Sequence, residues 1–264
     1  MMTMAELKGY DLGRQRVAYD NRDVLLYNLA VGAIGEELDL VYERELRALP
    51  TFATALGLWA SERTGVLGAY DNQRTLHVGQ RLEMRGTLPA AADLEMTGRV
   101  AQVYDKGGPA LIEVAVESEV FVATYVLFAP GAGGFGGERG PSSSASEPEG
   151  EPALRGTVVT DRRQALWYRL TGDRHPMHVD PILAASAGYP RPILHGLCTL
   201  GAVALEIARL AGEHPADLAS VDVRFSSPVL PGDTLTVEAW SRPTRAVKAR
   251  VGEATALSGT MDWR

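Results

Sequence analysis

The 264-residue chain has very little cysteine and no excess of basic charge, and each absence excludes a class of protein. Cys198 is the only cysteine, so neither an intrachain disulfide nor a cysteine-built metal cage can form. Lysine and arginine together number 26, against 33 aspartate and glutamate residues, which gives a formal net charge of −7. Without a basic excess, few counterions can be released from a phosphate backbone, which argues against nucleic acid as the main partner.

Long apolar segments are missing as well. The longest apolar run, Leu197 to Leu205, ends at Glu206 and is well short of the roughly 20 residues that span a bilayer. The first residues, MMTMAELKGYDLG, contain no apolar stretch as long as a signal peptide needs, and the final residues, MDWR, form no retention or peroxisomal address. We therefore expect a cytoplasmic protein with no membrane partner.

The rest of the composition is that of an ordinary globular protein, 45% hydrophobic and 22% charged, with one sharp break. From Pro130 to Pro152, glycine, proline and serine fill 15 of 23 positions. Such a segment buries too little apolar surface to fold by itself, so it indicates a linker between two halves.

The two halves resemble each other at a fixed spacing. Tyr27 in DNRDVLLYNL corresponds to Tyr168 in DRRQALWYRL, an offset of 141 residues. Pro50 and Pro192 each precede an apolar run, and the Leu-Pro pairs before LEMTGRV and LTVEAWS also correspond, both at an offset of 142. Three landmarks at one spacing indicate a duplicated domain.

Each half combines one apolar helix pattern with several strand patterns. In the second half, residues 195–212 are apolar on nearly all faces, which is typical of a buried helix. Short alternating segments separated by proline and glycine follow it, and the first half repeats the scheme with PTFATALGLWAS as its helix. A buried helix and an antiparallel sheet that wraps it predict an α+β, hotdog-like unit, with the two sheets side by side.

The densest polar cluster, TGDRHPMHVDP at residues 171–181, occurs in the second half only. In the first half Gly32 stands opposite Asp173 and Glu37 opposite His178, so the asymmetry predicts one site per chain. A carboxylate and an imidazole at this spacing suit general acid–base chemistry on one water. A solvated loop with a helix cap and a metal site stay open as alternatives. The candidate ligands of such a metal site are Asp173, His175, His178 and Asp180.

Other signals are weaker. Gly196 follows His195 at the start of the buried helix, where free backbone N–H groups can bind a developing oxyanion; an ordinary helix start explains it as simply. Cys198 falls within the helix pattern and is interpreted as an inert core thiol. The GAGGFG segment has the spacing of a dinucleotide fingerprint, but no helix pattern follows it, so no such cofactor is predicted.

The segment YRLTGDRHPMHVDPILAASAGYPRPILHGLCTLG resembles the hydratase 2 motif of MaoC-like (R)-specific enoyl-CoA hydratases, including the hydratase domain of peroxisomal multifunctional enzyme type 2. Further segments similar to this family, among them RDVLLYNLAVGA, YDKGG, GAGGFGGERG and VRFSSPVLPGDTL, extend over nearly the whole chain. The resemblance implies a double hotdog. Its parts would be a degenerate, acyl-accommodating N-terminal repeat (1–140), a linker (141–153) and a C-terminal repeat with the motif (154–264).

The same resemblance implies a lyase that hydrates a trans-2-enoyl-CoA to a (3R)-3-hydroxyacyl-CoA without a metal or other cofactor. By this resemblance Asp173 and His178 hold and activate the water, and the Gly196 N–H polarises the thioester carbonyl. Contacts to the acyl-CoA are implied for His77, Val78, Lys106, Arg174, His175, Pro176, Met177 and Phe225. A homodimer is also expected from the resemblance.

Two positions depart from the family pattern. His175 replaces an asparagine two residues after Asp173, and Val78 replaces a glycine after His77. The first change alters hydrogen bonding near the water, and the second puts a backbone contact to the ligand in question. Two further alternatives remain: a dehydratase that acts on hydroxyacyl groups of an acyl-carrier protein or polyketide, and a non-catalytic acyl-CoA-binding partner subunit.

Overall fold

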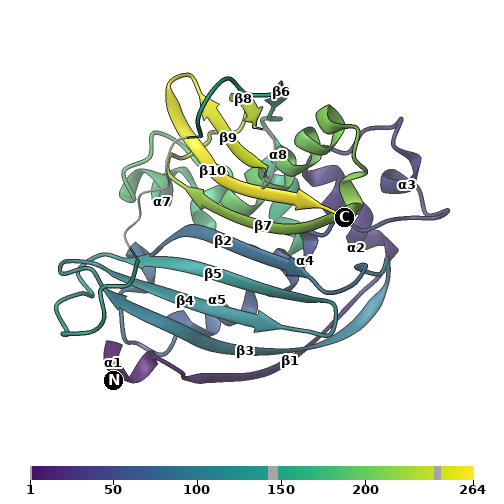
Figure 1. Cartoon of the computed structure of the whole chain (residues 1–264). Coiled ribbons are helices and arrows are strands. Elements are labelled where there is room, and N and C mark those ends of the chain that lie inside the picture. Colours follow the sequence, from purple (N-terminus) through teal and green to yellow (C-terminus); the bar gives the residue numbers. More distant parts are fainter. Residues whose placement is uncertain (1, 142–147, 241–244) are drawn as a thin grey trace.

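The computed structural model describes residues 2–141, 148–240 and 245–264 and is built around one ten-stranded antiparallel sheet (Figure 1). The first half contains α1 (Met4–Leu7), β1 (Asp11–Tyr19), α2 (Asn21–Ala30), α3 (Leu38–Val41), α4 (Phe52–Leu56), α5 (Trp59–Gly65), the 3-10 helix η1 (Asn72–Arg74), β2 (Leu76–Met84), β3 (Ala92–Asp105), β4 (Ala110–Glu117) and β5 (Phe121–Ala129). The second half contains β6 (Leu154–Val159), α6 (Gln164–Tyr168), η2 (Arg169–Thr171), η3 (Pro176–His178), α7 (Pro181–Ser186), α8 (Gly196–Ala211), η4 (Pro215–Asp217), β7 (Leu218–Phe225), β8 (Thr234–Ala239), β9 (Ala246–Val251) and β10 (Ala254–Trp263).

The sheet order shows the duplication directly. The strand order is β1-β3-β4-β5-β2-β7-β10-β9-β8-β6. Counted outward from the central β2–β7 pair, the strands of each half follow the same order: β2, β5, β4, β3 and β1 correspond to β7, β10, β9, β8 and β6. This antiparallel seam runs from Gly79 opposite Arg224 to Glu83 opposite Ser220. The two sheets therefore lie side by side as one sheet, as the sequence predicts, and the helices α4, α5 and α8 lie behind it (Figure 1).

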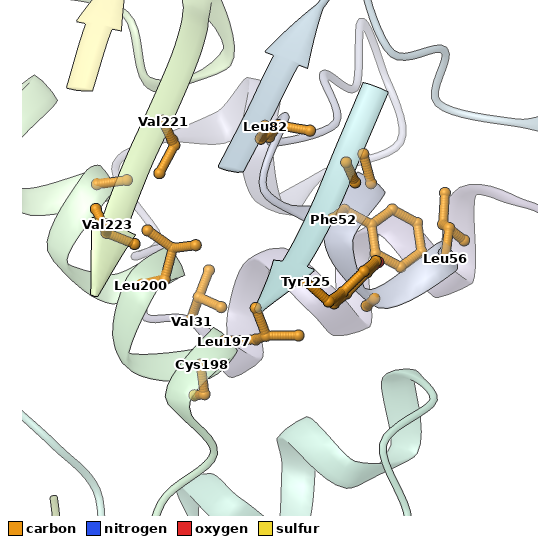
Figure 2. Packing of buried hydrophobic residues seen from close by; sticks show 14 of the residues in the cluster. Val31, Phe52, Leu56, Leu82, Tyr125, Leu197, Cys198, Leu200, Val221 and Val223 are labelled. Carbon is orange, nitrogen blue, oxygen red and sulfur yellow. The ribbon is translucent and has the colours of Figure 1, made fainter. Parts of the chain in front are cut away.

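Helix α8 is the central buried helix of the second repeat, and it packs closely against α2 of the first. A Cβ atom on Gly201 would lie 2.6 Å from Cγ1 of Val31 and 3.0 Å from the hydroxyl of Tyr27, so only glycine allows this approach. Figure 2 shows Val31, Leu197 and Leu200 within one cluster of buried residues from both repeats. The rings of Tyr27 and Tyr168, equivalent positions in the two repeats, lie 5.9 Å apart between their centroids.

The first repeat has two short helices where the sequence predicts one. α4 ends at Leu56 with Gly57 as its C-cap, and α5 begins at Trp59. The hydroxyl of Tyr125 donates a 2.6 Å hydrogen bond to the Thr54 carbonyl, and a Cβ on Gly57 would lie 2.6 Å from that hydroxyl. Tyr125 on β5 thus fills the space beside Gly57 and donates a hydrogen bond to a carbonyl in the last turn of α4. Together these contacts interrupt the helix.

The first part of the glycine-rich segment is fixed to the β3–β4 turn. The carboxylate of Asp105 accepts hydrogen bonds from the backbone N–H groups of Gly107 (2.8 Å), Gly134 (2.8 Å) and Gly136 (2.7 Å). These bonds favour the charged form and lower the pKa of Asp105 to about 2. Residues 142–147 of the predicted linker lie outside the described residues, and the boundaries at 140/141 and 153/154 stay predictions. Within the described ranges, no helix is both long and apolar enough to cross a bilayer.

Candidate active site

The polar motif of the second repeat forms a loop between η2 and α7. Gly172 begins it with φ +141°, a backbone conformation that side chains rarely allow. The next residue, Asp173, is partly buried, and its Oδ1 accepts a 3.1 Å hydrogen bond from the His175 backbone N–H. This short turn fixes one carboxylate oxygen. Among the described residues, none donates a hydrogen bond to the other oxygen, so it can face a ligand.

His178 ends η3 and is buried, with 8% of its surface exposed. Its Nδ1 lies 2.9 Å from the carbonyl oxygen of Ile193. A carbonyl can only accept, so Nδ1 carries the hydrogen and Nε2 of the neutral ring is an acceptor. Burial lowers the pKa of His178 below its ordinary value, although the charge of Asp173 acts in the opposite direction. The ring is therefore a neutral acceptor at pH 7.

His195 lies against His178, a contact that sequence reasoning missed. The two imidazole rings are stacked, with centroids 3.7 Å apart and planes 27° from parallel. Nε2 of His195 is 3.2 Å from the backbone carbonyl of Asp173. Burial lowers the pKa of His195 to about 3. The sequence pointed to His195 only through its place before Gly196. A histidine at the start of a helix does not reveal a contact with a residue 17 positions earlier.

Gly196 is the first residue of α8, so its N–H has no partner within the helix. A Cβ atom on this glycine would lie 3.4 Å from the ring of Phe225, at the end of β7. The ring of Phe225 in turn meets His77 edge to face, at 5.2 Å between centroids. Gly196, Phe225 and His77 thus form a continuous wall where the two repeats join at β2 and β7.

Val78 lies at an irregularity of β2. In the pairing of β2 with β5, His77 is opposite Leu127 and Gly79 opposite Val126, so Val78 is the extra residue of a β-bulge. Nε2 of His77 lies 2.9 Å from the Gly79 carbonyl across this bulge, and burial lowers the pKa of His77 to about 4. The bulge leaves the Val78 backbone out of that ladder, which is the position where the family glycine was expected to contact the ligand.

The remaining predicted contact residues fall into two places. Arg174, His175 and Pro176 are exposed and Met177 is partly buried on the motif loop. Lys106 lies elsewhere, on the β3–β4 turn, with β4 and β5 between its strand and β2. Its ammonium donates a 2.9 Å hydrogen bond to the Pro141 carbonyl and lies 5.6 Å from the Tyr104 ring centroid. A role of Lys106 toward the ligand stays a prediction.

The cluster of possible metal ligands in the structure differs from the set that the sequence suggested. His175 caps η3 through Nδ1, and Asp180 caps α7 through its carboxylate, so neither joins the cluster. Asp173, His178 and His195 do come together, with one candidate ligand atom each within 4.8 Å of one another. However, the rings of His178 and His195 are stacked and nearly parallel, so their nitrogen lone pairs do not converge on one ion. This geometry favours acid–base chemistry over metal coordination.

Comparison with known proteins identifies the family of the chain. Residues 143–261 match the MaoC-like domain family, and residues 17–128 match the MFE-2 hydratase 2 N-terminal domain. The peroxisomal enoyl-CoA hydratase 2 of Arabidopsis thaliana is 34% identical over 98% of this chain and 94% of its own. The 3-hydroxyacyl-thioester dehydratase Y of Mycobacterium tuberculosis is 39% identical over 87% of this chain and 84% of its own. A MaoC-like dehydratase from Phytophthora capsici superposes with a TM-score of 0.87, at 26% identity, over 98% of this chain and 96% of that structure.

The fold is an α+β double hotdog, and its second repeat carries the cluster of Asp173, His178 and His195. The chain belongs to the MaoC-like, hydratase 2 family.

Proposed function

We propose that this protein is an (R)-specific enoyl-CoA hydratase, which adds water to a trans-2-enoyl-CoA and forms a (3R)-3-hydroxyacyl-CoA. The observation that carries the proposal is the cluster of two hydrogen-bond acceptors, the Asp173 carboxylate and the neutral His178 ring, with His195, the residue directly before the Gly196 N–H at the start of α8. The enoyl-CoA hydratase among its relatives supports the reaction class.

The spacing of the two acceptors suits one water molecule. A carboxylate oxygen of Asp173 and a ring nitrogen of His178 lie within 4.8 Å of each other. A water that donates two hydrogen bonds of about 2.8 Å at a tetrahedral angle bridges two acceptors about 4.6 Å apart. Both hydrogens of such a water are engaged, so a lone pair of its oxygen is free to attack the β-carbon of the substrate.

The reaction is balanced by the groups at the site. As the water oxygen bonds to the β-carbon, one of its protons passes to the pair formed by Asp173 and His178. The electrons of the double bond move to the thioester carbonyl, which becomes an enolate-like oxygen. The Gly196 N–H at the start of α8, together with the positive end of the helix dipole, stabilises that charge. The pair then returns the proton to the α-carbon.

A second candidate is the reverse reaction, dehydration of a hydroxyacyl thioester. The same acid–base groups serve both directions because the two reactions share one transition state. The 39% sequence identity to a 3-hydroxyacyl-thioester dehydratase favours this second candidate. The two differ in the thioester carrier that binds, coenzyme A or an acyl-carrier protein, and in the direction in which the enzyme is used.

The experiment follows the loss of the enoyl-thioester absorbance with crotonyl-CoA and with a long-chain trans-2-enoyl-CoA, and then determines the configuration of the product. Formation of the 3R alcohol supports the proposal. Formation of the 3S alcohol, or no reaction of a folded protein with either substrate, contradicts it. Activity with acyl-carrier-protein substrates alone selects the second candidate.

We also propose a cytoplasmic location and a homodimeric state, and neither follows from the site. Several relatives are named as peroxisomal, so imaging of the tagged protein in its own cells tests the location. Size-exclusion chromatography with light scattering tests the dimer, since one chain has a mass of 28.4 kDa.

A further inference from the structure

His195 contacts or adjoins all three groups that the proposed reaction uses. Its ring stacks on His178 with centroids 3.7 Å apart. Its Nε2 reaches the backbone carbonyl of Asp173 at 3.2 Å. The next residue along the chain is Gly196, and the carbonyl of His195 accepts the backbone N–H of Thr199 at 3.1 Å, which closes the first turn of α8.

The hydrogen-bond pattern fixes the state of this ring. The Asp173 carbonyl can only accept, so Nε2 of His195 carries the hydrogen. Burial, with 1% of the residue exposed, lowers the pKa of His195 to about 3. The ring is therefore neutral at pH 7. Its Nδ1 is a buried acceptor without a protein partner among the described residues.

We propose that His195 is a positioning residue that holds Asp173 and His178 in fixed relation to the Gly196 N–H; the inference rests on the proposed function. The hydrogen bond to Asp173 fixes the loop that carries the carboxylate. The stacked ring fixes the plane of His178 and keeps water from that face. Being neutral, His195 adds no positive charge next to a ring that must accept a proton, whereas an imidazolium at this distance would oppose it.

Other charged and titratable groups also act on the two rings. Asp173 favours the protonated form of both, His175 disfavours protonation of His178, and Arg169 disfavours protonation of His195. The ring of Tyr168 also packs on His195, at 4.9 Å between centroids. His195 contacts both the ring of His178 and the carbonyl of Asp173, so its removal should disturb the relation between the catalytic groups.

Two substitutions separate the two roles. His195→Gln places an amide N–H about as far from the backbone as Nε2 and keeps a donor for the Asp173 carbonyl, but it removes the ring. His195→Phe keeps a ring against His178 and removes the donor. The matched control is His214→Gln, because His214 is the N-cap before η4 and is paired with Asp39 (2.7 Å) away from the site.

Steady-state kinetics with crotonyl-CoA measure the first readout. We expect both His195 variants to lose about 10- to 100-fold in kcat, as misplaced catalytic groups do, while KM stays within about threefold. The control should keep wild-type kcat. Wild-type kcat in both folded His195 variants, or an equal loss of kcat in His214→Gln, would overturn the inference.

Imidazole NMR provides a second readout that needs no substrate. The chain has five histidines, so the signals of ¹⁵N-histidine-labelled protein can be assigned by single substitutions. In His195→Gln, water reaches the uncovered face of His178, and we expect the pKa of His178 to rise toward its ordinary value. An unchanged titration of His178 would show that His195 does not shield it and would overturn the inference. If the wild-type protein hydrates no enoyl-CoA, the proposed function fails, and this titration still decides the role of His195.

Discussion

Glu37 and Arg209 form a two-pronged ion pair between the repeats, with Nε to Oε1 at 2.7 Å and Nη2 to Oε2 at 2.6 Å. Glu37 occupies the position of the first repeat that His178 occupies in the second. Arg209 also donates a 3.1 Å hydrogen bond to the carbonyl of Gly32, the counterpart of Asp173. The first-repeat counterpart of the loop with Asp173 and His178 is therefore bound to α8 of the second repeat.

This pair gives a stability prediction. Glu37→Gln should lower the free energy of unfolding by about 1–2 kcal/mol at pH 7, because the lost charge-assisted hydrogen bonds are only partly exposed to water. Urea unfolding measures it. The matched control is Glu95→Gln, which breaks the exposed pair with Arg14 and should change stability by less than about 0.5 kcal/mol. Equal effects of the two substitutions would contradict the prediction.

The same pair predicts an acid dependence. Burial raises the pKa of Glu37, but hydrogen bonds from Arg209 and from the Ile34 backbone outweigh it, so the pKa is lowered in the folded protein. A lowered pKa contributes stability above the unfolded value of about 4.3, and this contribution is lost as pH falls through the folded value. The difference between wild type and Glu37→Gln should therefore be full at pH 7 and should shrink as pH falls below the unfolded value.

Removal of either acid–base group should abolish most of the turnover. We expect Asp173→Asn and His178→Gln each to lower kcat by about 10²–10⁴, the usual contribution of a general acid–base group, with unchanged circular dichroism. The control is Asp180→Asn in the same motif, since asparagine also caps a helix such as α7. Near-normal turnover in either of the first two variants would contradict the mechanism, and loss of turnover in the control would revive the metal interpretation.

His175→Asn should keep or raise activity. His175 caps η3 by accepting the Met177 N–H at its Nδ1, at 3.3 Å. The oxygen of an asparagine side chain can accept the same bond, and the backbone N–H that reaches Asp173 is unaffected. Crotonyl-CoA hydration at pH 7 measures the result. A loss of more than about tenfold in kcat would show that the imidazole has its own role in this chain.

The pH profile follows from the state of His178. Its pKa is lowered from the ordinary 6.5 by burial, so the ring stays a neutral acceptor as pH falls through 6.5 and is protonated only below it. The values of kcat/KM should therefore remain level from pH 8 to about pH 6.5 and fall at lower pH. An acid limb centred above 6.5 would mean that the pKa of the essential group is raised, which would contradict the lowered pKa of His178.

Gly196→Ala should separate stability from activity. The new Cβ would lie at an ordinary contact distance of 3.4 Å from the Phe225 ring, so the fold can accept it. The methyl group, however, enters the space at the start of α8 where the proposed reaction would place the thioester carbonyl. We expect an unchanged or slightly higher melting temperature and a loss of about 10-fold or more in kcat/KM. Retained kcat/KM would contradict the placement of the carbonyl at this N–H.

The duplication and the sheet arrangement could be predicted from the sequence because both depend on local patterns. The fixed offset between Tyr27 and Tyr168 and the strand alternation in each half are visible in the chain itself. The break between α4 and α5 was not predictable in the same way. It results from the Tyr125 hydroxyl, which comes from a strand 71 positions away in the sequence, and no helix propensity reports such a contact.

The site was predictable to the extent that one motif carries it. Asp173 and His178 lie within one short loop, so their proximity follows from the sequence spacing. His195 depends on the return of the chain after α7, and its stacking on His178 is a tertiary contact. The bulge at Val78 is likewise a property of strand pairing, since it exists only relative to β5. The sequence showed that Val78 replaces the family glycine, but it did not show that this residue lies at a β-bulge.

The β2–β7 seam has a consequence for how the protein holds together. The halves share backbone hydrogen bonds from Gly79 to Glu83 and a common core, so the covalent connection between them is not what unites them. A chain cut between the repeats should run as one species on a native gel and as two on a denaturing gel. Two genes, each encoding one half, should restore turnover when expressed together, which makes this protein a candidate for a split reporter.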